Sequence, residues 1–129
     1  MKDLSTYIEE VRLSDVRRTV SYDDNYHPKD RDELMDLLGK LIHKRGYDGD
    51  FNDIDTGAVT DMHELFANTS FNGNVSKWDV SNVKDMSRMF YNTRFFGDLS
   101  KWDVDKDCRT FQMFDYSPRC LRPPKWYKR

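Results

Sequence analysis

The chain of 129 residues carries 21 basic and 23 acidic side chains, which gives a formal net charge of -2. This length indicates one domain, and the nearly balanced charge excludes a global field that would attract DNA or anionic lipid. Charged residues make up 34% of the chain, hydrophobic residues only 37% and aromatic residues 14%. The composition therefore predicts a thin, ring-rich structure with much solvated surface rather than a compact ball.

The N-terminal stretch, residues 2–20, predicts a short amphipathic helix. Leu4, Ile8 and Val11 stand at i, i+4 and i+7, a spacing that places side chains on one helical face. Residues 21–27 are polar and rich in turn formers, so we expect a connector there. The connector should lead the chain into a second helix.

Residues 28–45 predict the clearest helix of the chain. Pro28 suits a first helical turn, acidic side chains follow it, basic side chains precede the end, and Gly46 suits a helix stop. The apolar stripe of this helix consists of Leu34, Leu37, Leu38, Leu41 and Ile42. We expect residues 1–46 to form a helical cap whose stripe lies over the open end of the first repeat and shields its strand edge.

Three imperfect copies of a 24-residue unit follow, at residues 47–70, 71–94 and 95–118. Nine positions are identical between the second and third copies, and eight between the first and second. A fixed period in this range is typical of a solenoid, in which each unit buries its apolar face only by stacking on its neighbours.

The first half of the unit predicts one strand per copy. Gly49, Gly73 and Gly97 each stand two residues after an aromatic side chain, which suits a turn or a close backbone approach. A short apolar run with β-branched and aromatic members then follows. Its positions are Phe51, Ile54 and Thr56 in the first copy, Val75, Trp78 and Val80 in the second, and Leu99, Trp102 and Val104 in the third. Because the Trp residues share a position with Ile54, we expect them to pack between adjacent coils.

The second half of the unit predicts a helix, because apolar residues recur there every three or four positions. They are Val59, Met62, Leu65 and Phe66 in the first copy and Val83, Met86, Met89 and Phe90 in the second. Asp61 and Asp85 precede the methionines, where a carboxylate can cap a first helical turn, and Glu64 completes a capping box with Asp61. The predicted fold class is α/β, a solenoid of about three strand-plus-helix repeats.

These residues carry a family resemblance. The strings FNGNVSKWDVSNVKDMSRMFYN and GDLSKWDV resemble the leucine-rich-repeat-like modules of the BspA type, also described as the DUF285 or mycoplasma-lipoprotein repeat. The likeness covers residues 47 to about 117, and the preceding helix resembles the helical segment that often precedes such repeats. The resemblance implies a short leucine-rich-repeat-like solenoid but no particular function, because this scaffold serves many contacts.

The third copy and the chain after it depart from the pattern. Asp107, Arg109 and Thr110 replace the valine, aspartate and methionine of the second copy, so we expect a shifted or frayed helix, as in a terminal repeat. Residues 119–129 hold five positive charges, two prolines and no acid, and they predict an extended basic capping segment. Trp126 is expected to fold back as a lid on the third repeat or to stack on nucleic-acid bases.

The sequence contains no recognisable catalytic, cofactor or metal motif. The acidic cluster at residues 48–55 resembles a calcium loop but lacks Gly at the sixth position and Glu at the twelfth. Asp55, Asp79 and Asp103 recur in register, which favours a structural role such as accepting backbone N–H bonds at a turn. We therefore predict no enzyme activity, no cofactor and no metal.

Cys108 and Cys120 form no metal-ligand pattern, and a disulfide between them stays open. The first residues show no secretory signal, and no span is long enough to cross a bilayer. The family name implies surface lipoproteins for many relatives, but this sequence predicts a cytoplasmic protein with no membrane partner.

The leading functional hypothesis is a monomeric, non-enzymatic protein-protein interaction module that binds a macromolecular partner through an exposed repeat face. Two alternatives stay open. One is a small inhibitor of the kind carried by mobile elements, which blocks a host enzyme or nucleic-acid-binding protein; the other is nucleic-acid contact through the basic tail. The candidate partner-binding residues are His63, Lys77, Arg88, Lys101, Gln112, Arg122, Lys125, Trp126, Lys128 and Arg129.

Overall fold

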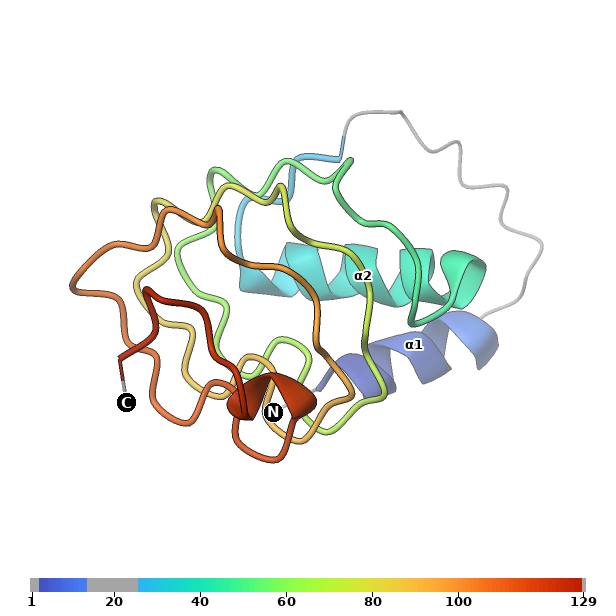
Figure 1. The fold of residues 1–129 in the computed structure, drawn as a ribbon. Coiled ribbons are helices and arrows are strands. Elements are labelled where there is room, and N and C mark those ends of the chain that lie inside the picture. Colours follow the sequence, from blue (N-terminus) through green and yellow to red (C-terminus); the bar gives the residue numbers. More distant parts are fainter. Residues whose placement is uncertain (1–2, 14–25, 129) are drawn as a thin grey trace.

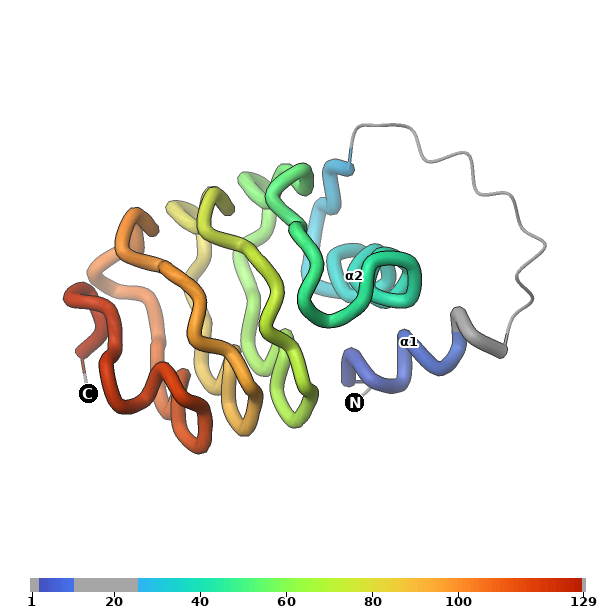
Figure 2. The backbone as a smooth tube through the Cα atoms, turned by 45° about the vertical axis from the view of Figure 1, so that its right-hand side comes forward, coloured from blue at the N-terminus to red at the C-terminus, as the bar shows by residue number. Residues whose placement is uncertain are grey.

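The computed structural model describes residues 3–13 and 26–128 (Figure 1). In these residues the chain forms two α-helices, α1 (Leu4–Leu13) and α2 (Arg31–Arg45), and a late 3-10 turn, η1 (Pro118–Cys120), with no strand among them. Between α2 and η1 the chain winds through three stacked turns, best seen in Figure 2. We name them coil 1 (residues 47–70), coil 2 (residues 71–94) and coil 3 (residues 95–118).

Both helices predicted for the N-terminal part are confirmed in the described residues, and α2 begins later than predicted. Asp30, not Pro28, begins α2, because its carboxylate accepts a hydrogen bond from the backbone N–H of Glu33 at 2.9 Å. Gly46 ends the helix with φ at 82°, a conformation that favours glycine. Residues 14–20 of the first predicted helix, most of the predicted connector and Arg129 lie outside the described residues.

The helices pack on each other and on the start of the stack. The predicted stripe of α2 is buried except for Leu37, which is partly buried against the same core. Gly39 allows α1 to cross closely, since a Cβ at this position would lie 3.0 Å from the Tyr7 Cβ and 3.1 Å from the Tyr7 backbone carbon. In Figure 2, α2 lies beside coil 1 and α1 lies below α2.

One set of backbone hydrogen bonds in the second half of each coil joins it to the next coil with an offset of 23 residues, as from Met62 to Asp85. The N–H groups of Met62, Glu64, Phe66 and Asn68 donate to the carbonyls of Asp85, Ser87, Met89 and Tyr91 at 2.8 to 2.9 Å. The N–H groups of Met86, Arg88, Phe90 and Asn92 donate to the carbonyls of Arg109, Phe111, Met113 and Asp115 at 2.7 to 3.0 Å. In this half of each coil, each of these N–H groups therefore points toward the next coil.

The predictions of one strand and one helix in each repeat are wrong. The coils pair through isolated parallel bridges, such as Asp61 with Asp85 and Asp85 with Arg109, and the predicted helical segments are turns. Glu64 and Asn68 have φ values of 53° and 60°, which interrupt a right-handed helix. The Met62 N–H bonds to the next coil rather than to a carbonyl four residues back. The frayed helix expected in the third copy does not exist either, because coil 3 keeps the backbone register of coil 2.

Recurring polar side chains close the corners of the coils. The carboxylates of Asp61 and Asp85 each accept from the N–H two residues on, at 3.0 and 2.9 Å, so they close turns and cap no helix. Asp55 and Asp79 accept in the same way from Gly57 and Ser81. These bonds confirm the structural role predicted for the recurring aspartates Asp55 and Asp79.

Stacked rings fill the core, as predicted from the repeat. The rings of Phe66, Phe90 and Phe114 follow one another with centroids 5.4 and 5.7 Å apart, and all three residues are buried. Trp78 and Trp102 are also buried, and each donates its indole N–H to a carbonyl of the preceding coil at 2.8 and 2.9 Å. The interpretation of both Trp residues as core residues is confirmed.

The repeated glycine leaves room for a neighbouring side chain, which is Arg45 at Gly49, the Phe51 and Phe71 rings at Gly73 and the Phe95 ring at Gly97. A Cβ added at Gly73 would lie 2.6 Å from the ring of Phe51 in coil 1 and 2.8 Å from the ring of Phe71. Only Gly46 among the described glycines has a positive φ. Space, not backbone conformation, therefore requires glycine at this position of the unit.

Neither helix of the described residues has the length and apolarity needed to cross a membrane. Cys108 and Cys120 do not form a disulfide with each other in the structure. The architecture is thus a domain with two helices, little regular secondary structure and a large buried aromatic cluster.

Candidate functional site

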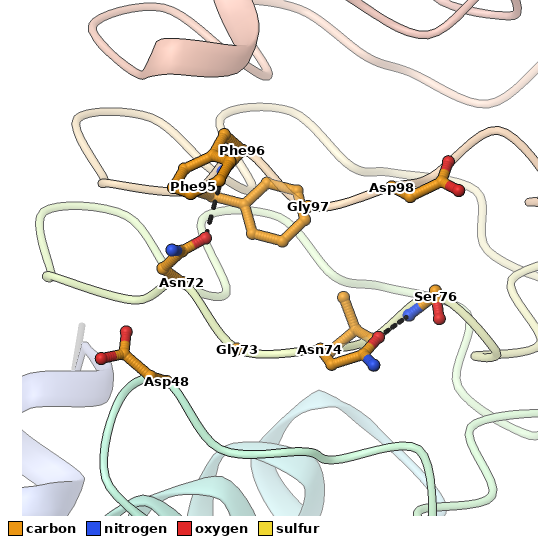
Figure 3. A pocket seen from close by; sticks show the side chains of 10 residues that line it. Asp48, Asn72, Gly73, Asn74, Ser76, Phe95, Phe96, Gly97 and Asp98 are labelled. Atoms are coloured by element: carbon orange, nitrogen blue, oxygen red, sulfur yellow. Dashed lines mark hydrogen bonds between the residues drawn. The ribbon is translucent and has the colours of Figure 1, made fainter.

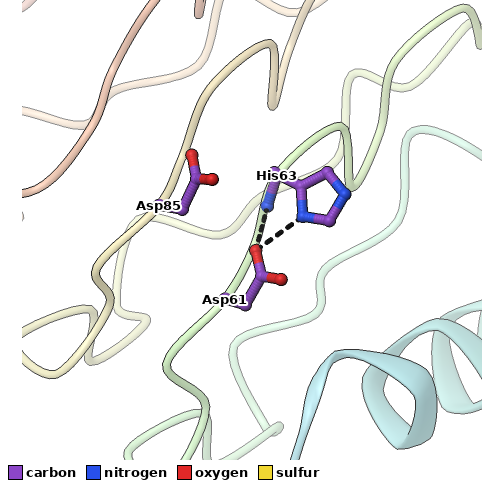
Figure 4. A group of neighbouring side chains, drawn as sticks. All are labelled: Asp61, His63 and Asp85. Atoms are coloured by element: carbon purple, nitrogen blue, oxygen red, sulfur yellow. Dashed lines mark hydrogen bonds and ion pairs between the residues drawn. The ribbon is translucent and has the colours of Figure 1, made fainter.

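Three potential metal ligands meet where coil 1 lies on coil 2 (Figure 4). Ligand atoms of Asp61, His63 and Asp85 all lie within 4.8 Å of one another. An imidazole with two carboxylates suits a divalent transition metal. However, one Asp61 oxygen already accepts from both the backbone N–H and the ring Nδ1 of His63, at 3.0 and 2.7 Å. The set offers at most three protein ligands, and two of them also close turns of the coils.

Several open hollows of about 330 to 420 Å³ mark the described surface. One of about 350 Å³ lies between coils 2 and 3, with Asp48 of coil 1 at its rim (Figure 3). Asn72 accepts from the Phe96 N–H at 3.2 Å, and Asn74 accepts from the Ser76 N–H at 3.1 Å. The amide side chains of this hollow therefore stabilise the coils, and they do not converge on a ligand.

The Cys108 thiol is not activated as a nucleophile. Burial raises the pKa of the Cys108 thiol to about 11, and the nearby Asp85 carboxylate acts in the same direction. The thiolate is the nucleophile in cysteine chemistry. Cys108 is therefore a protonated, poorly reactive thiol at neutral pH.

Exposed large hydrophobic side chains among the described residues gather in coil 3 and the segment just after it. They are Phe96, Phe111, Tyr116 and Leu121, which are 60%, 67%, 76% and 87% exposed. The positions that match the first three in coil 2 hold Asn72, Ser87 and Asn92, and those in coil 1 hold Asp48, His63 and Asn68. Polar side chains suffice at these positions for stacking in coils 1 and 2, so coil 3 differs from them in exposing apolar side chains there.

The predicted partner-binding residues occupy several places and form no single site. Arg88 and Gln112 come together, since the Arg88 Nε donates to the Gln112 side chain at 2.8 Å. His63 is half-buried against Asp61 in the group described above. Besides Arg88, the exposed cations among the predicted residues that the structure describes are Lys77, Lys101, Arg122, Lys125 and Lys128. Whether any of these residues binds a partner stays a prediction.

Trp126 continues the repeat instead of lying free in the tail. Its indole N–H donates to the Leu99 carbonyl at 2.8 Å, and its ring stacks on Trp102 at 6.2 Å. Trp78 and Trp102 make equivalent bonds to the coils before them. The ring of Trp126 therefore covers the end of the core, which agrees with the expected lid. Because this ring already stacks on Trp102, it is not available to stack on a nucleic-acid base.

Sequence analysis missed the exposed aromatic residues of coil 3. The signal was present, because aligning the three copies shows rings at positions that are polar in both earlier copies. Lys125 and Trp126 also stand 24 residues after Lys101 and Trp102, so the repeat continues beyond the third copy. Both signals appear only when the copies are aligned with one another, and neither is a local motif.

Comparison with known proteins gives a family but no activity. The family described as "Mycoplasma protein of unknown function, DUF285" matches residues 21–125. No curated protein and no solved structure matches the chain.

Proposed function

The chain belongs to the DUF285 family, and from this premise we propose a non-enzymatic protein-protein interaction module that binds a partner protein through coil 3. In this proposal the stack is a short leucine-rich-repeat-like solenoid. Its first two coils and its cap supply rigidity, and its third coil supplies recognition. Repeat stacks present extended surfaces of this kind.

One observation carries the proposal, namely the exposure of Phe96, Phe111 and Tyr116 at positions that are polar in coils 1 and 2. Solvent-exposed aromatic side chains of this size are enriched at interfaces, where they supply much of the binding free energy. Stacking does not require them, because the corresponding polar side chains of coil 2 stack in the same register.

A matched pair of variants tests the proposal. The first variant gives coil 3 the residues of coil 2, by Phe96→Asn, Phe111→Ser and Tyr116→Asn. The control gives coil 1 the residues of coil 2, by Asp48→Asn and His63→Ser. Tagged wild-type protein is used to capture partners from a lysate of the source cells, and each captured protein is then titrated with all three proteins.

We expect the coil 3 variant to lose affinity at least about tenfold, the loss of one or more interface anchors. The control should bind like the wild type. Equal binding by the coil 3 variant, or no partner retained at micromolar protein, would contradict the proposal.

Nucleic-acid contact through the basic tail is a second candidate, because Lys77, Lys101 and Lys125 share one position of the unit and are all exposed. Because Trp126 stacks on Trp102, nucleic acid would be bound through the lysine charges and not through stacking on this ring. Binding of a single-stranded oligonucleotide should then weaken steeply between low and physiological salt, and Lys101→Gln with Lys125→Gln should abolish it. Salt-independent binding would exclude this candidate.

A further inference from the structure

The outer edge of coil 3 carries a row of backbone donors that the fold leaves unused. Thr110, Gln112, Phe114 and Tyr116 stand 24 residues after the four donors through which coil 2 binds coil 3. Among the residues that the structure describes, none of these four N–H groups has an acceptor. The segment after η1 covers the other half of the coil, where Trp126 bonds to the Leu99 carbonyl.

This edge is chemically one-sided. The alternate carbonyls of the same segment, from Arg109 to Asp115, already accept from coil 2. The edge therefore offers N–H donors at every second residue and needs a partner that brings acceptors with the same spacing. Two copies of this chain cannot pair edge to edge through it, because donors would face donors.

The acceptor end of the stack is closed as well. Arg31 of α2 is buried, and its Nε donates to the His63 carbonyl at 2.8 Å. With α2 packed against coil 1, a second copy cannot add its first coil to the third coil of another copy. The first coil of a second copy therefore does not supply the acceptor row for coil 3.

Side chains beside the donor row indicate what that chain should carry. Phe111 and Tyr116, at 67% and 76% exposed, flank the row on coil 3. Tyr116 also meets the Tyr91 ring edge-on at 5.4 Å. Phe114, by contrast, is 1% exposed and contacts Trp126 and Tyr127, so its N–H is covered and not open to a partner. An extended peptide with apolar side chains satisfies both the donors and the exposed rings.

We infer that coil 3 binds an extended segment of a partner protein as a fourth layer, in parallel register with the coils. The segment supplies backbone carbonyls to Thr110, Gln112 and Tyr116, and apolar side chains to Phe111 and Tyr116. The two existing coil-coil junctions define the register that it adopts. This inference rests on the proposed function, since it names the partner element that the coil 3 surface receives.

The probe for the test is a synthetic peptide with the sequence of residues 84–93, KDMSRMFYNT. In the fold this segment already presents carbonyls to a preceding coil with the required spacing. A peptide of the same composition in scrambled order is the control. Amide hydrogen exchange of the whole chain, followed by NMR, reports each N–H group separately.

In the protein without peptide, the amides of Gln112 and Tyr116 should exchange at least about tenfold faster than those of Arg88 and Asn92, their equivalents in coil 2. Saturation with the probe should slow exchange at Thr110, Gln112 and Tyr116 by at least about tenfold, whereas the scrambled peptide should not. Protection of these amides in the free monomer would mean that the edge is already covered, and it would overturn the inference.

A pair of variants separates the edge from the rest of coil 3. Phe111→Ser with Tyr116→Asn should weaken probe binding at least about tenfold while leaving thermal unfolding close to wild type. Glu64→Arg, which gives coil 1 the residue of coil 2 far from the edge, should leave binding within about twofold.

The remaining outcomes are distinct. No binding at about 1 mM probe, or probe binding that shifts amides away from residues 110–116, overturns the edge inference. The proposed function still stands in that case, provided that the captured partner remains sensitive to the coil 3 variant. A concentration-dependent dimer that protects these amides would identify a second copy as the occupant and would also overturn the inference.

Discussion

The two ends of the stack are closed by different means. At coil 1, α2 covers the end with a buried apolar stripe, Arg31 donates to the His63 carbonyl, and Arg45 makes two hydrogen bonds of 2.8 Å to the Asp53 carboxylate. At coil 3, Trp126 and Tyr127 cover only the ring column, through contacts with Trp102 and Phe114. In the second half of the coils, N–H groups of alternate residues donate toward coil 3. This part of the stack therefore ends in backbone acceptors at coil 1 and in backbone donors at coil 3. Arg31 and α2 cover the acceptors at coil 1, whereas the donors at the edge of coil 3 stay open.

The largest effect should follow from breaking the closed end. Leu38→Asp with Leu41→Asp places two carboxylates where the wild-type residues are 0% and 1% exposed. We expect a loss of more than about 4 kcal/mol in the free energy of unfolding, followed by aggregation of the exposed stack. Light scattering and thermal unfolding measure both effects.

The open end supplies the control for that experiment. Phe111→Asp should change the unfolding free energy by no more than about 0.5 kcal/mol, because the wild-type side chain is 67% exposed. A soluble monomer with unchanged Tm for the double Asp variant would refute the assignment of α2 as the cap.

A smaller effect is expected from opening one hydrogen bond at the closed end. Arg31→Met keeps most of the buried volume but leaves the His63 carbonyl without its donor. We expect a loss of about 1 to 3 kcal/mol, the penalty of an unsatisfied buried acceptor. Urea unfolding measures it, with Lys29→Met on the exposed side as the control. Equal stabilities of the two variants would show that water replaces the guanidinium without cost.

A stabilising change is expected at the open end. Tyr116 has φ at 60°, and the matching positions of coils 1 and 2 are Asn68 and Asn92, whose side chains bond to each other at 3.0 Å. Because Asn tolerates this backbone conformation, Tyr116→Asn should add about 0.5 to 1 kcal/mol. The reverse change, Asn92→Tyr, should cost a similar amount by the same measurement. Destabilisation by Tyr116→Asn would show that the contact between the Tyr116 and Tyr91 rings stabilises the fold by more than the positive φ of Tyr116 costs.

At neutral pH the smallest effect concerns the Cys108 thiol, which lies between the two ends of the stack. The pKa of Cys108 is raised from 9.0 to about 11. Its alkylation rate at pH 8 should therefore be about 100-fold below that of an unperturbed thiol and should keep rising beyond pH 9. The unfolded thiol ionises first, so stability should fall as pH rises from 9 towards 11.

Mass spectrometry with iodoacetamide follows the alkylation rate of Cys108 as a function of pH. Asp85→Asn should move the profile to lower pH, because it removes a carboxylate that raises this pKa. A rate that levels off near pH 9 in the wild type would contradict the burial of this thiol.

The period and the core were readable in the sequence because burial leaves a mark on composition. A buried position in a stack must be apolar in every copy, so Phe66 and Phe90 align, and Trp78 aligns with Trp102. The cap helix was readable for a related reason, since its stripe and its stop at Gly46 are local signals. The predicted bounds were off by a few residues because both Pro28 and Asp30 suit a helix start, and only Asp30 makes the capping bond.

The local structure of the coils was not readable. Apolar residues three and four apart occur in a helix, but they also occur in a chain that turns at Asp61 and again near Glu64. Which of these forms depends on where the Met62 N–H finds its acceptor, and that acceptor lies 23 residues away. Periodicity cannot report a bond to another coil.

By itself, the sequence determined a 24-residue period, an aromatic core, a helical cap and membership of one family, because these depend on which positions are apolar. The tertiary structure alone decided that the coils contain turns instead of strands and helices, that Asp61, His63 and Asp85 meet, and that the donor row of coil 3 stays open. The physical reason is that backbone N–H and C=O groups are the same in every residue, so their direction and their partners exist only once the coils are stacked.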